Sequence, residues 1–375
     1  MPQIRRVETV LTAAAPPHRW LLSRVVADDG RIGLGDASDS LAPATTIAAI
    51  HELLAPLVLG RDSSTPPAPG DLAAFGHGGL RLPFEGLPLR TAASAIEMAL
   101  WDLTARLQDV PLVTLLGGEP GEVPLYANVN RGLPDHQPET IADAARRALD
   151  LGFDAVKCAP FAGVARDDPA LDGVELGLRR VEQVRAVIGD AGLLVDAHGR
   201  LDAAQARHAA PRLQDLGVGW FEEPARFEDD PAVLFAAAAA STVPVAAGEL
   251  LPRDGYRALI GHGATTIVMT DVKHNGGVGA TLAVGEMCAA AERRLSLHNP
   301  TGPVSTLFSA HIRRRIGGDG PDEYATHPDR LRESELLVGG DDGRRGGTIV
   351  IDDRPGIGID LDPKALAAAS VQTSE

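Results

Sequence analysis

LLVDAH (193–198), GWFEEP (219–224) and VPVAAGE (243–249) are three short apolar segments that each carry acidic residues at or near the carboxyl end. Each segment has the length and apolar composition of one buried β-strand, and a longer stretch with helical spacing separates it from the next. Strands that alternate with helices in this way pair in parallel and are covered by helices on their faces. We therefore expect the three segments to be successive strands of one parallel sheet.

The same alternation extends in both directions along the chain. Further strand-like segments read VPLYANV, DAVKCAP, TIVMTD, RLSLHN and, more weakly, DEYATH, at 123–129, 154–160, 266–271, 294–299 and 322–327. Eight strand–helix units within about 200 residues predict an α/β fold of the TIM-barrel type. A doubly wound open sheet is the alternative, but Gly33-Leu34-Gly35 opens no helix and lacks the rest of a dinucleotide-binding fingerprint.

The first third of the chain has a different pattern. Segments 20–27 and 31–36 flank Asp28-Asp29-Gly30, a turn signature that predicts a β-hairpin. Apolar residues recur with helical spacing over 45–58 and over 91–108, and the second of these helices is expected to start at a Thr or Ser cap. Hairpin and helices together predict a small α+β unit.

These patterns predict three parts of the chain. We expect an α+β capping domain over residues 1–122 and a (β/α)₇β barrel over residues 123–335. Residues 336–375 form a C-terminal segment, in which 346–362 reads as further strands that return to the first domain.

Composition limits the class of partner. The 375 residues include 51 Asp and Glu against 35 Lys and Arg, a net charge of −16, so neither nucleic acid nor an anionic membrane is expected as a partner. Cys158 and Cys288 are too few for a disulfide framework, and the chain shows no apolar leader or membrane span. We expect a cytoplasmic protein.

The acidic residues at the strand ends indicate a metal site. In a barrel the carboxyl ends of the strands form one face, so Asp196, Glu222 and Glu249 are expected to converge there. Three neighbouring carboxylates stay ionised together only beside a cation, and oxygen ligands favour Mg²⁺. A single strand-end carboxylate is more often a solvated loop residue, but three at intervals of 26 and 27 residues weigh against that alternative.

A second pair lies on the next two strands. Asp271 ends the predicted strand 266–271, and His298 lies near the end of the strand 294–299, so the two side chains are expected to meet. A carboxylate beside an imidazole fixes its tautomer and raises its basicity, which suits a general base. The alternative is a structural histidine.

Two further side chains share the predicted barrel interior by the period-two rule for strands. His198 follows Asp196 at that spacing, so we expect it beside the metal, and Lys157 is expected to point inward and to meet an anion. The alternatives are a histidine that hydrogen-bonds a loop and a lysine at the surface. Cys158 points the opposite way and is expected to be a core residue.

The motifs resemble those of the enolase superfamily, in particular its mandelate racemase-like branch. The matching segments are AIEMALWDLTARLQDVPLVTLLGG (95–118), GFDAVK (152–157), VDAHGR (195–200), WFEEP (220–224), AAGE (246–249), DVKHNGG (271–277) and HNPTGP (298–303). This resemblance implies a capping domain over a (β/α)₇β barrel with Mg²⁺ at its mouth. It is closest to the sugar-acid dehydratases of the galactonate type.

The resemblance also implies roles for individual residues. By position, Asp196, Glu222 and Glu249 match the three metal ligands, Asp271 and His298 match an Asp–His dyad that acts as base, and His198 matches the general acid. Glu323 is the expected match to an acid that hydrogen-bonds the substrate carboxylate, with Asp322 or Glu335 as alternatives. Lys157 is expected to neutralise charge on the substrate.

One motif departs from the racemase pattern, which has Lys-x-Lys where this chain reads Lys157-Cys158-Ala159. The missing second lysine argues against two-base racemisation. Asp271 also stands where muconate-lactonising enzymes and dipeptide epimerases carry a lysine. The expected reaction is therefore Mg²⁺-dependent dehydration of an acid sugar to a 2-keto-3-deoxy acid.

Several alternatives remain open. The first is an epimerase, racemase or lactone cycloisomerase acting on a sugar acid by the same enolate chemistry. A metal-binding regulatory protein and a zinc hydrolase belong to other classes, and no His-x-His pair ends the first predicted strand to support the hydrolase. The partner expected is a small carboxylate substrate, together with further copies of this chain in a homo-oligomer.

Specificity is expected to come from capping loops at 14–20 and 72–88, which are rich in Gly and Pro. Candidate contacts to a polyhydroxylated substrate are His18, Arg19, Trp20 and Arg81, although each is as readily an ordinary loop residue.

Overall fold

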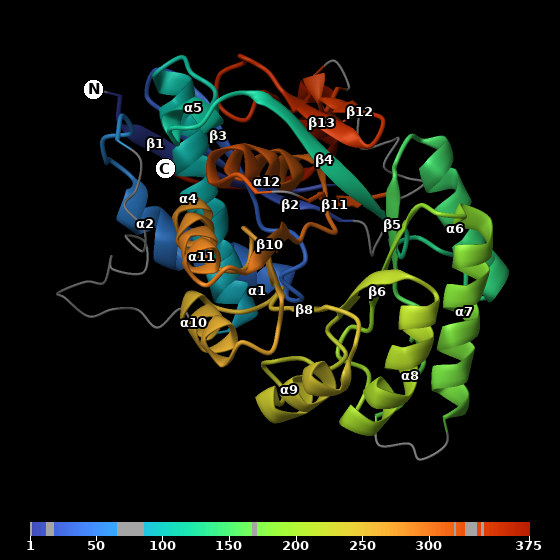
Figure 1. Ribbon diagram of the computed structural model, residues 1–375. Helices are drawn as coiled ribbons and strands as arrows, with labels where there is room; N and C mark the ends of the chain where they lie inside the picture. Colours follow the sequence, from blue (N-terminus) through green and yellow to red (C-terminus); the bar gives the residue numbers. More distant parts are fainter. Residues whose placement is uncertain are drawn as a thin grey trace.

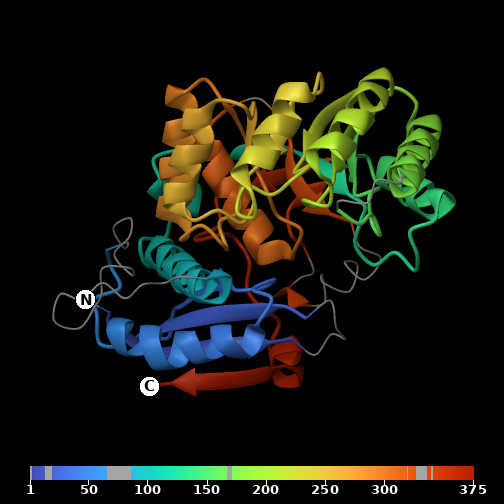
Figure 2. The same cartoon turned by 90° about the horizontal axis from the view of Figure 1, so that it is seen from below.

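The computed structural model describes residues 2–12, 19–65, 86–166, 171–318, 320–326, 336–338 and 341–375. Eight parallel strands with helices outside them form one part, and a smaller sheet with its own helices lies against that part (Figures 1 and 2). Among the residues that the structure describes, no helix combines the length and the apolar character needed to cross a membrane.

All eight expected barrel strands are present. They are β4 (Gly121–Asn128), β5 (Ala155–Cys158), β6 (Gly192–Asp196), β7 (Val218–Glu222), β8 (Val245–Ala247), β9 (Ile267–Thr270), β10 (Arg294–Leu297) and β11 (Asp322–Ala325). β4 to β10 pair in sequential order, and the last strand, β11, pairs with the first, β4. A doubly wound sheet reverses its strand order instead, so the open-sheet alternative is wrong and the barrel is confirmed.

Helices follow the strands and cover the outside of the barrel (Figure 1). They are α6 (Pro138–Asp150), α7 (Asp172–Ile188), α8 (Ala203–Asp215), α9 (Pro231–Ala240), α10 (Arg253–His262), α11 (Val278–Ala290) and α12 (Pro303–Ile316). The amphipathic faces of α6 and α7 bury Ile141, Val174 and Val181 against the strands, as the helical spacing of apolar residues requires.

The barrel closes between β10 and β11 through side chains. The backbone N–H of Leu297 donates to Asp322 Oδ1 and that of Asn299 donates to Glu323 Oε2, each at 2.9 Å. Asp322 also accepts from the Arg313 guanidinium of α12 at 2.6 Å, so its side chain faces the helix layer. Glu323, its neighbour on the strand, faces the opposite way, into the barrel.

The smaller sheet has the order β14–β1–β2–β3. Its strands are β1 (Ile4–Leu11), β2 (Leu21–Ala27), β3 (Ile32–Asp36) and β14 (Ser370–Ser374). The hairpin expected from Asp28-Asp29-Gly30 is confirmed, because β2 and β3 pair antiparallel across that turn. The helix expected over 45–58 is formed by α1 (Pro43–Ala48), a π-helical segment η1 (Ala49–Leu54) and α2 (Ala55–Val58).

The C-terminal segment differs in part from expectation. Of residues 346–362, only β13 (Thr348–Ile351) is a strand of any length, and it pairs with β4 of the barrel after a short β12 (Arg344–Arg345). β4 needs this partner because its first four residues extend beyond its parallel neighbours β5 and β11. The strand that returns to the small sheet is β14, after α14 (Pro363–Ala368), and Figure 2 shows it at the sheet edge. The domain boundaries at 122 and 335 stay predictions.

α4 (Leu87–Leu107) joins the two parts and is buried along most of its length. It starts one turn earlier than expected, after Gly86 at φ +84°, so the predicted Thr or Ser cap is wrong. Thr91 and Ser94 lie inside the helix, and their hydroxyl groups contact residues of the loop that follows β9. A short helix, α5 (Leu112–Leu115), follows α4.

Asp102 on α4 ties three segments together. Its Oδ2 accepts from the backbone N–H of Leu34 in β3 at 2.8 Å and from Arg106 Nε at 2.9 Å. Its Oδ1 accepts from the backbone N–H of Ile357 in the C-terminal segment at 2.7 Å. The side chain is fully buried, so the three donors have no access to water as a substitute.

Replacing Asp102 by Ala is therefore expected to lower the free energy of unfolding by about 3 kcal/mol, because two buried N–H groups and a guanidinium lose their acceptor. Urea titration followed by circular dichroism measures the loss. Asp109→Asn, at an exposed residue just after the same helix, is the control and should stay within about 0.5 kcal/mol. Equal stability of the two variants would contradict this role of Asp102.

Candidate active site

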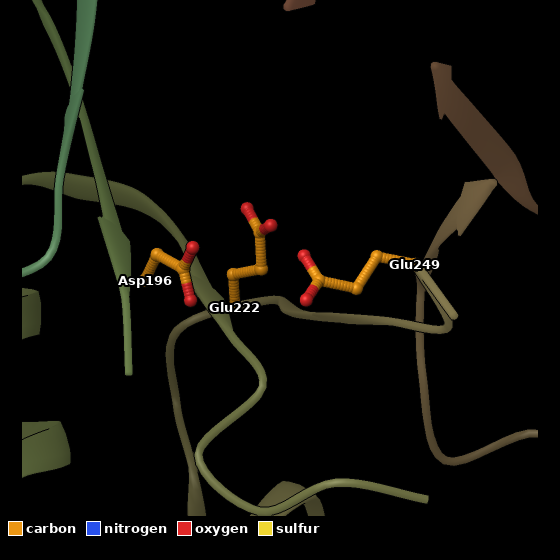
Figure 3. Close-up of side chains that lie close together, drawn as sticks. All are labelled: Asp196, Glu222 and Glu249. Atoms are coloured by element: carbon orange, nitrogen blue, oxygen red, sulfur yellow. The ribbon is translucent and has the colours of Figure 1, made fainter. Parts of the chain in front are cut away.

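Three carboxylates converge at the carboxyl ends of adjacent strands (Figure 3). Asp196 is the last residue of β6, Glu222 is the last of β7, and Glu249 lies two residues beyond β8. One oxygen from each lies within 4.8 Å of the others, and all three side chains are buried. The structure thus brings together the three acids predicted as metal ligands.

Each carboxylate of this triad contacts a basic side chain. His198 Nε2 lies 2.9 Å from Asp196 Oδ2, Lys157 Nζ lies 2.8 Å from Glu222 Oε1, and His298 Nε2 lies 3.1 Å from Glu249 Oε2. Since β6, β7 and β8 are consecutive, the two histidines bind the two outer carboxylates and Lys157 binds the middle one.

Burial acts to raise the pKa of all three triad acids. At Asp196 and Glu249 the neighbouring histidines and Lys157 outweigh burial, and the pKa lies below its usual value. At Glu222 burial raises the pKa to about 8, even though the Lys157 ammonium opposes the shift. Burial also acts to lower the pKa of Lys157, but the Glu222 and Glu323 carboxylates outweigh it and the pKa ends well above its ordinary value. Lys157 therefore stays charged, and the ionised carboxylates of Asp196 and Glu249 leave negative charge in the triad that a cation would neutralise.

The predicted Asp–His dyad is present. Asp271 follows β9, His298 follows β10, and His298 Nδ1 lies 2.8 Å from Asp271 Oδ2. This contact leaves Nε2 as the nitrogen that faces the triad. Burial acts to lower the pKa of His298, but Glu249 and Glu323 outweigh it and raise the pKa well above its usual value. Neutralising Glu249 would bring that pKa back toward the range of a general base.

His198 lies beside the triad, but not on a strand as the period-two rule supposed. β6 ends at Asp196, and His198 occupies a turn with φ +49°, a conformation that is uncommon outside glycine. Backbone bonds hold this turn, because Ala197 N–H donates to Glu222 O at 2.9 Å and Gly199 N–H donates to Glu223 O at 2.7 Å. Its side chain is 39% exposed, so it can meet a substrate.

Lys157 of β5 and Glu323 of β11 lie beside Glu222 in the barrel interior. Lys157 Nζ is 3.1 Å from Glu323 Oε1, and neither side chain is exposed. Glu323 also accepts from Asn128 Nδ2 at 2.5 Å. Asp322, the alternative to Glu323, faces Arg313 and is wrong for this position, whereas Glu335 lies outside the described residues.

Other buried polar residues complete the site and were not predicted from the sequence. Lys273 Nζ lies 2.7 Å from Asp271 Oδ2, and Trp220 Nε1 donates to Glu222 Oε2 at 3.0 Å. Together with His274 and His298, Lys273 offsets burial and keeps the pKa of Asp271 below its usual value. The sequence held a signal for Lys273 and Trp220, because each lies two residues from an acidic residue of the site.

Cys158 is buried in the core, and burial raises the pKa of its thiol to about 12.

Of the cap candidates, Trp20 and Arg19 are described, and His18 and Arg81 fall outside the described residues. Trp20 is buried and packs on Gly302, where a Cβ would lie 2.8 Å from its ring. Trp20 thus connects the cap to the barrel loop that follows His298. This packing accounts for the buried tryptophan without a contact to substrate.

The donor set fits Mg²⁺. A hard divalent cation takes carboxylate oxygens at about 2.1 Å, and three ligand oxygens within 4.8 Å of one another can reach a common centre at such distances after small rotations. Oxygen-only ligation leaves further positions for water or substrate. Asp196, Glu222 and Glu249 are therefore the residues that would hold the ion.

Comparison with known proteins agrees with this geometry. Residues 140–365 match the family model for enolase C-terminal domain-like proteins, and residues 9–117 match the N-terminal domain of mandelate racemase and muconate lactonizing enzyme. A solved structure, a member of the enolase superfamily from Salmonella Typhimurium, superposes with a TM-score of 0.87 over 100% of both chains at 22% sequence identity.

Several relatives are named as dehydratases, and two of them show the degree of similarity. The D-xylonate dehydratase of Haloferax volcanii is 29% identical over 389 residues, which covers 99% of this chain and 89% of that enzyme. The D-galactonate dehydratase of Verminephrobacter eiseniae is 30% identical over 319 residues, which covers 81% of this chain and 78% of that enzyme. The chain belongs to the enolase superfamily, in the family of mandelate racemase and muconate lactonizing enzyme.

Proposed function

We propose that the chain is a Mg²⁺-dependent sugar-acid dehydratase that converts an aldonate-type substrate to a 2-keto-3-deoxy acid. The observation that carries the proposal is the placement of two histidines at opposite ends of the carboxylate triad, His198 beside Asp196 and His298 beside Glu249. Elimination of water needs one group that removes a proton and another that delivers one to the leaving hydroxyl. The names of the relatives support the same reaction class.

The two histidines suit different roles. His298, held through Nδ1 by Asp271, would take the proton from C2 of the substrate at Nε2. His198 would give its proton to the hydroxyl that leaves C3, so that the C3–O bond breaks and water departs. Asp196 raises the pKa of His198, which favours its protonated form and suits an acid. The resulting enol tautomerises to the ketone at C2, with a proton added at C3.

Charge on the substrate has to be balanced during proton removal. When bound, Mg²⁺ would supply Lewis-acid stabilisation of the negative charge that spreads onto the substrate carboxylate. Lys157 is buried between Glu222 and Glu323 and pairs with both carboxylates. Any effect that it has on the charge of the substrate is therefore confined to the edge of this cluster. Its contacts favour a role in holding Glu222 and Glu323 in place, with Glu323 directed toward His298 at 3.8 Å.

Substitution of each histidine by Asn should separate the two roles. His298→Asn is expected to abolish both dehydration and the exchange of the C2 proton with solvent, because the base is lost. His198→Asn is expected to lose dehydration, by on the order of 10²–10⁴-fold, yet to keep C2–H exchange in D₂O. Proton NMR follows the exchange, and semicarbazide detects the 2-keto product in a screen of sugar acids.

Three results would decide against this assignment. Near-full activity of His298→Asn would exclude it as the base. Retained dehydration in His198→Asn would exclude it as the acid. Stereochemical inversion at C2 without loss of water from any sugar acid would favour the epimerase alternative.

Metal binding should depend on pH. Because burial raises the pKa of Glu222 to about 8, this carboxyl keeps its proton below that pH and must lose it to bind a cation. The apparent Mg²⁺ affinity is therefore expected to rise with pH, by up to about tenfold per unit below pH 8, and to level off above it. Isothermal calorimetry between about pH 6 and pH 9, in buffers of different ionisation enthalpy, measures the affinity and counts the released proton.

Glu222→Gln is the matched variant, because it removes this titration together with one ligand charge. It should bind Mg²⁺ weakly and with a smaller dependence on pH. An affinity of the unmodified protein that stays constant across this range would contradict the raised pKa of Glu222.

A further inference from the structure

Glu249, Asp271 and His298 lie just beyond the last residues of β8, β9 and β10, at the edge of the regular strand pairing. Glu249 is the clearest case, because β8 ends at Ala247 and Gly248 has φ +114°. The carbonyl groups on both sides of Glu249 are held by side chains instead. Tyr256 Oη donates to Gly248 O at 2.7 Å, and Arg90 Nη2 donates to Leu250 O at 2.7 Å. The direction of the Glu249 side chain therefore depends on two donors from helices.

The Arg90 guanidinium reaches a second loop at the same time. Its Nε donates at 3.2 Å to the carbonyl of His274, in the segment 271–277 that carries the dyad residue Asp271. His274 N–H in turn donates to Asp271 O at 3.0 Å. One half-buried cation on α4 of the cap thus bridges the loop of a triad carboxylate and the loop of the dyad.

Neighbouring residues of α4 extend this contact along one helix face. Thr91 Oγ1 lies 2.9 Å from His274 Nδ1, and Gly276 N–H donates to Ser94 Oγ at 3.0 Å. Glu97 accepts from Val278 N–H at 2.7 Å, at the start of α11. Residues 90, 91, 94 and 97 recur at helical spacing, so a single face of α4 follows the whole segment after Asp271.

We infer that Arg90 is a positioning residue of the site, which holds Glu249 and Asp271 at their mutual distance. Both residues contact His298, through Nε2 at 3.1 Å and Nδ1 at 2.8 Å. A shift of either loop therefore moves the base or its partner. The inference rests on the proposed function only where it concerns turnover, since the placement of Glu249 also governs metal binding.

The chemistry of the side chain explains why arginine is needed. Its planar fork directs Nε and Nη2 to two different carbonyl groups, whereas the ammonium of lysine is a single point of charge. A second arginine of the same helix provides a comparison. Arg106 donates to Ile359 O at 2.5 Å and pairs with Asp102 and Asp360, so it also joins α4 to another segment, but away from the triad.

The test compares Arg90→Met with the matched control Arg106→Met in the full chain. Mn²⁺ binding to the substrate-free protein is measured by electron paramagnetic resonance, next to Tm, kcat and KM. In Arg90→Met the Kd for Mn²⁺ is expected to rise about tenfold, and kcat to fall about 10- to 100-fold while KM changes less than about threefold. Arg106→Met should lower Tm and leave the Kd for Mn²⁺ and kcat within about twofold.

Two further variants separate positioning from a loss of folding. Arg90→Lys keeps the charge and reaches one carbonyl, so its Kd for Mn²⁺ should lie between those of the unmodified protein and Arg90→Met. In Arg90→Ala, added guanidinium ion should restore part of the Mn²⁺ affinity, and it should not do so in Arg106→Met.

A lowered Tm in Arg90→Met with unchanged Mn²⁺ affinity and kcat would overturn the inference. Failure of the proposed function has a different signature. If no sugar acid is dehydrated, the weaker Mn²⁺ binding of Arg90→Met still supports the positioning role.

Discussion

Three carboxylates buried within 4.8 Å of one another repel each other, and this repulsion explains the kinds of residue found around them. Lys157 on the neighbouring strand pairs with Glu222, and histidines pair with Asp196 and Glu249. Without these partners burial would favour proton uptake by the acids. Each acid of the triad therefore has a basic partner, and two of these partners, His198 and His298, are the groups to which the proposed acid–base chemistry is assigned.

The helix α4 connects the fold to the site. Strand ladders place Asp196, Glu222, Lys157 and Glu323, whereas His198, Glu249, Asp271 and His298 lie beyond the ends of their strands. Backbone and side-chain bonds have to hold these four residues. Those for Glu249 and Asp271 come in part from Arg90 of the cap helix. The cap thus belongs to the framework of the site, in addition to any contact that it makes with substrate.

The barrel could be predicted from the sequence because its buried parallel strands read as continuous apolar runs, and the site acids mark where these runs end. The partners of the site acids were harder to find. Asn128 contacts Glu323 only because folding brings β4 and β11 together, whereas Lys273 and Trp220 each contact a site acid two residues away in the sequence. Thr91 and Ser94 resembled helix caps because hydroxyl residues favour that position, but their hydroxyl groups bond to a barrel loop instead.

β14 was not predicted from the sequence, for another reason. Its sequence, SVQTS, has almost no apolar residue, because the strand lies at a sheet edge and four of its five residues are exposed. Pairing with β1 orders it, and the hydroxyl group of Ser374 lies 2.7 Å from His51 Nδ1. A strand that is stabilised by backbone bonds, with little side-chain burial, leaves no hydrophobic period in the sequence.

The charge of the site bears on how an anionic substrate could enter it. The chain carries a net charge of −16, which repels an anion at long range. Within the site, the carboxylates of Asp196, Glu222, Glu249, Asp271 and Glu323 face the lysines Lys157 and Lys273. With all five acids ionised, as they would be above the raised pKa of Glu222, and with neutral histidines, these groups sum to −5 + 2 = −3.

A divalent cation on the triad would change that sum to −1, and a protonated His198 would bring it to zero. A substrate carboxylate would then meet a neutral site in place of a strongly negative one. A buried site built mainly from acids can thus accept an acid, because the charge that governs recognition is that of the loaded site and not that of the chain.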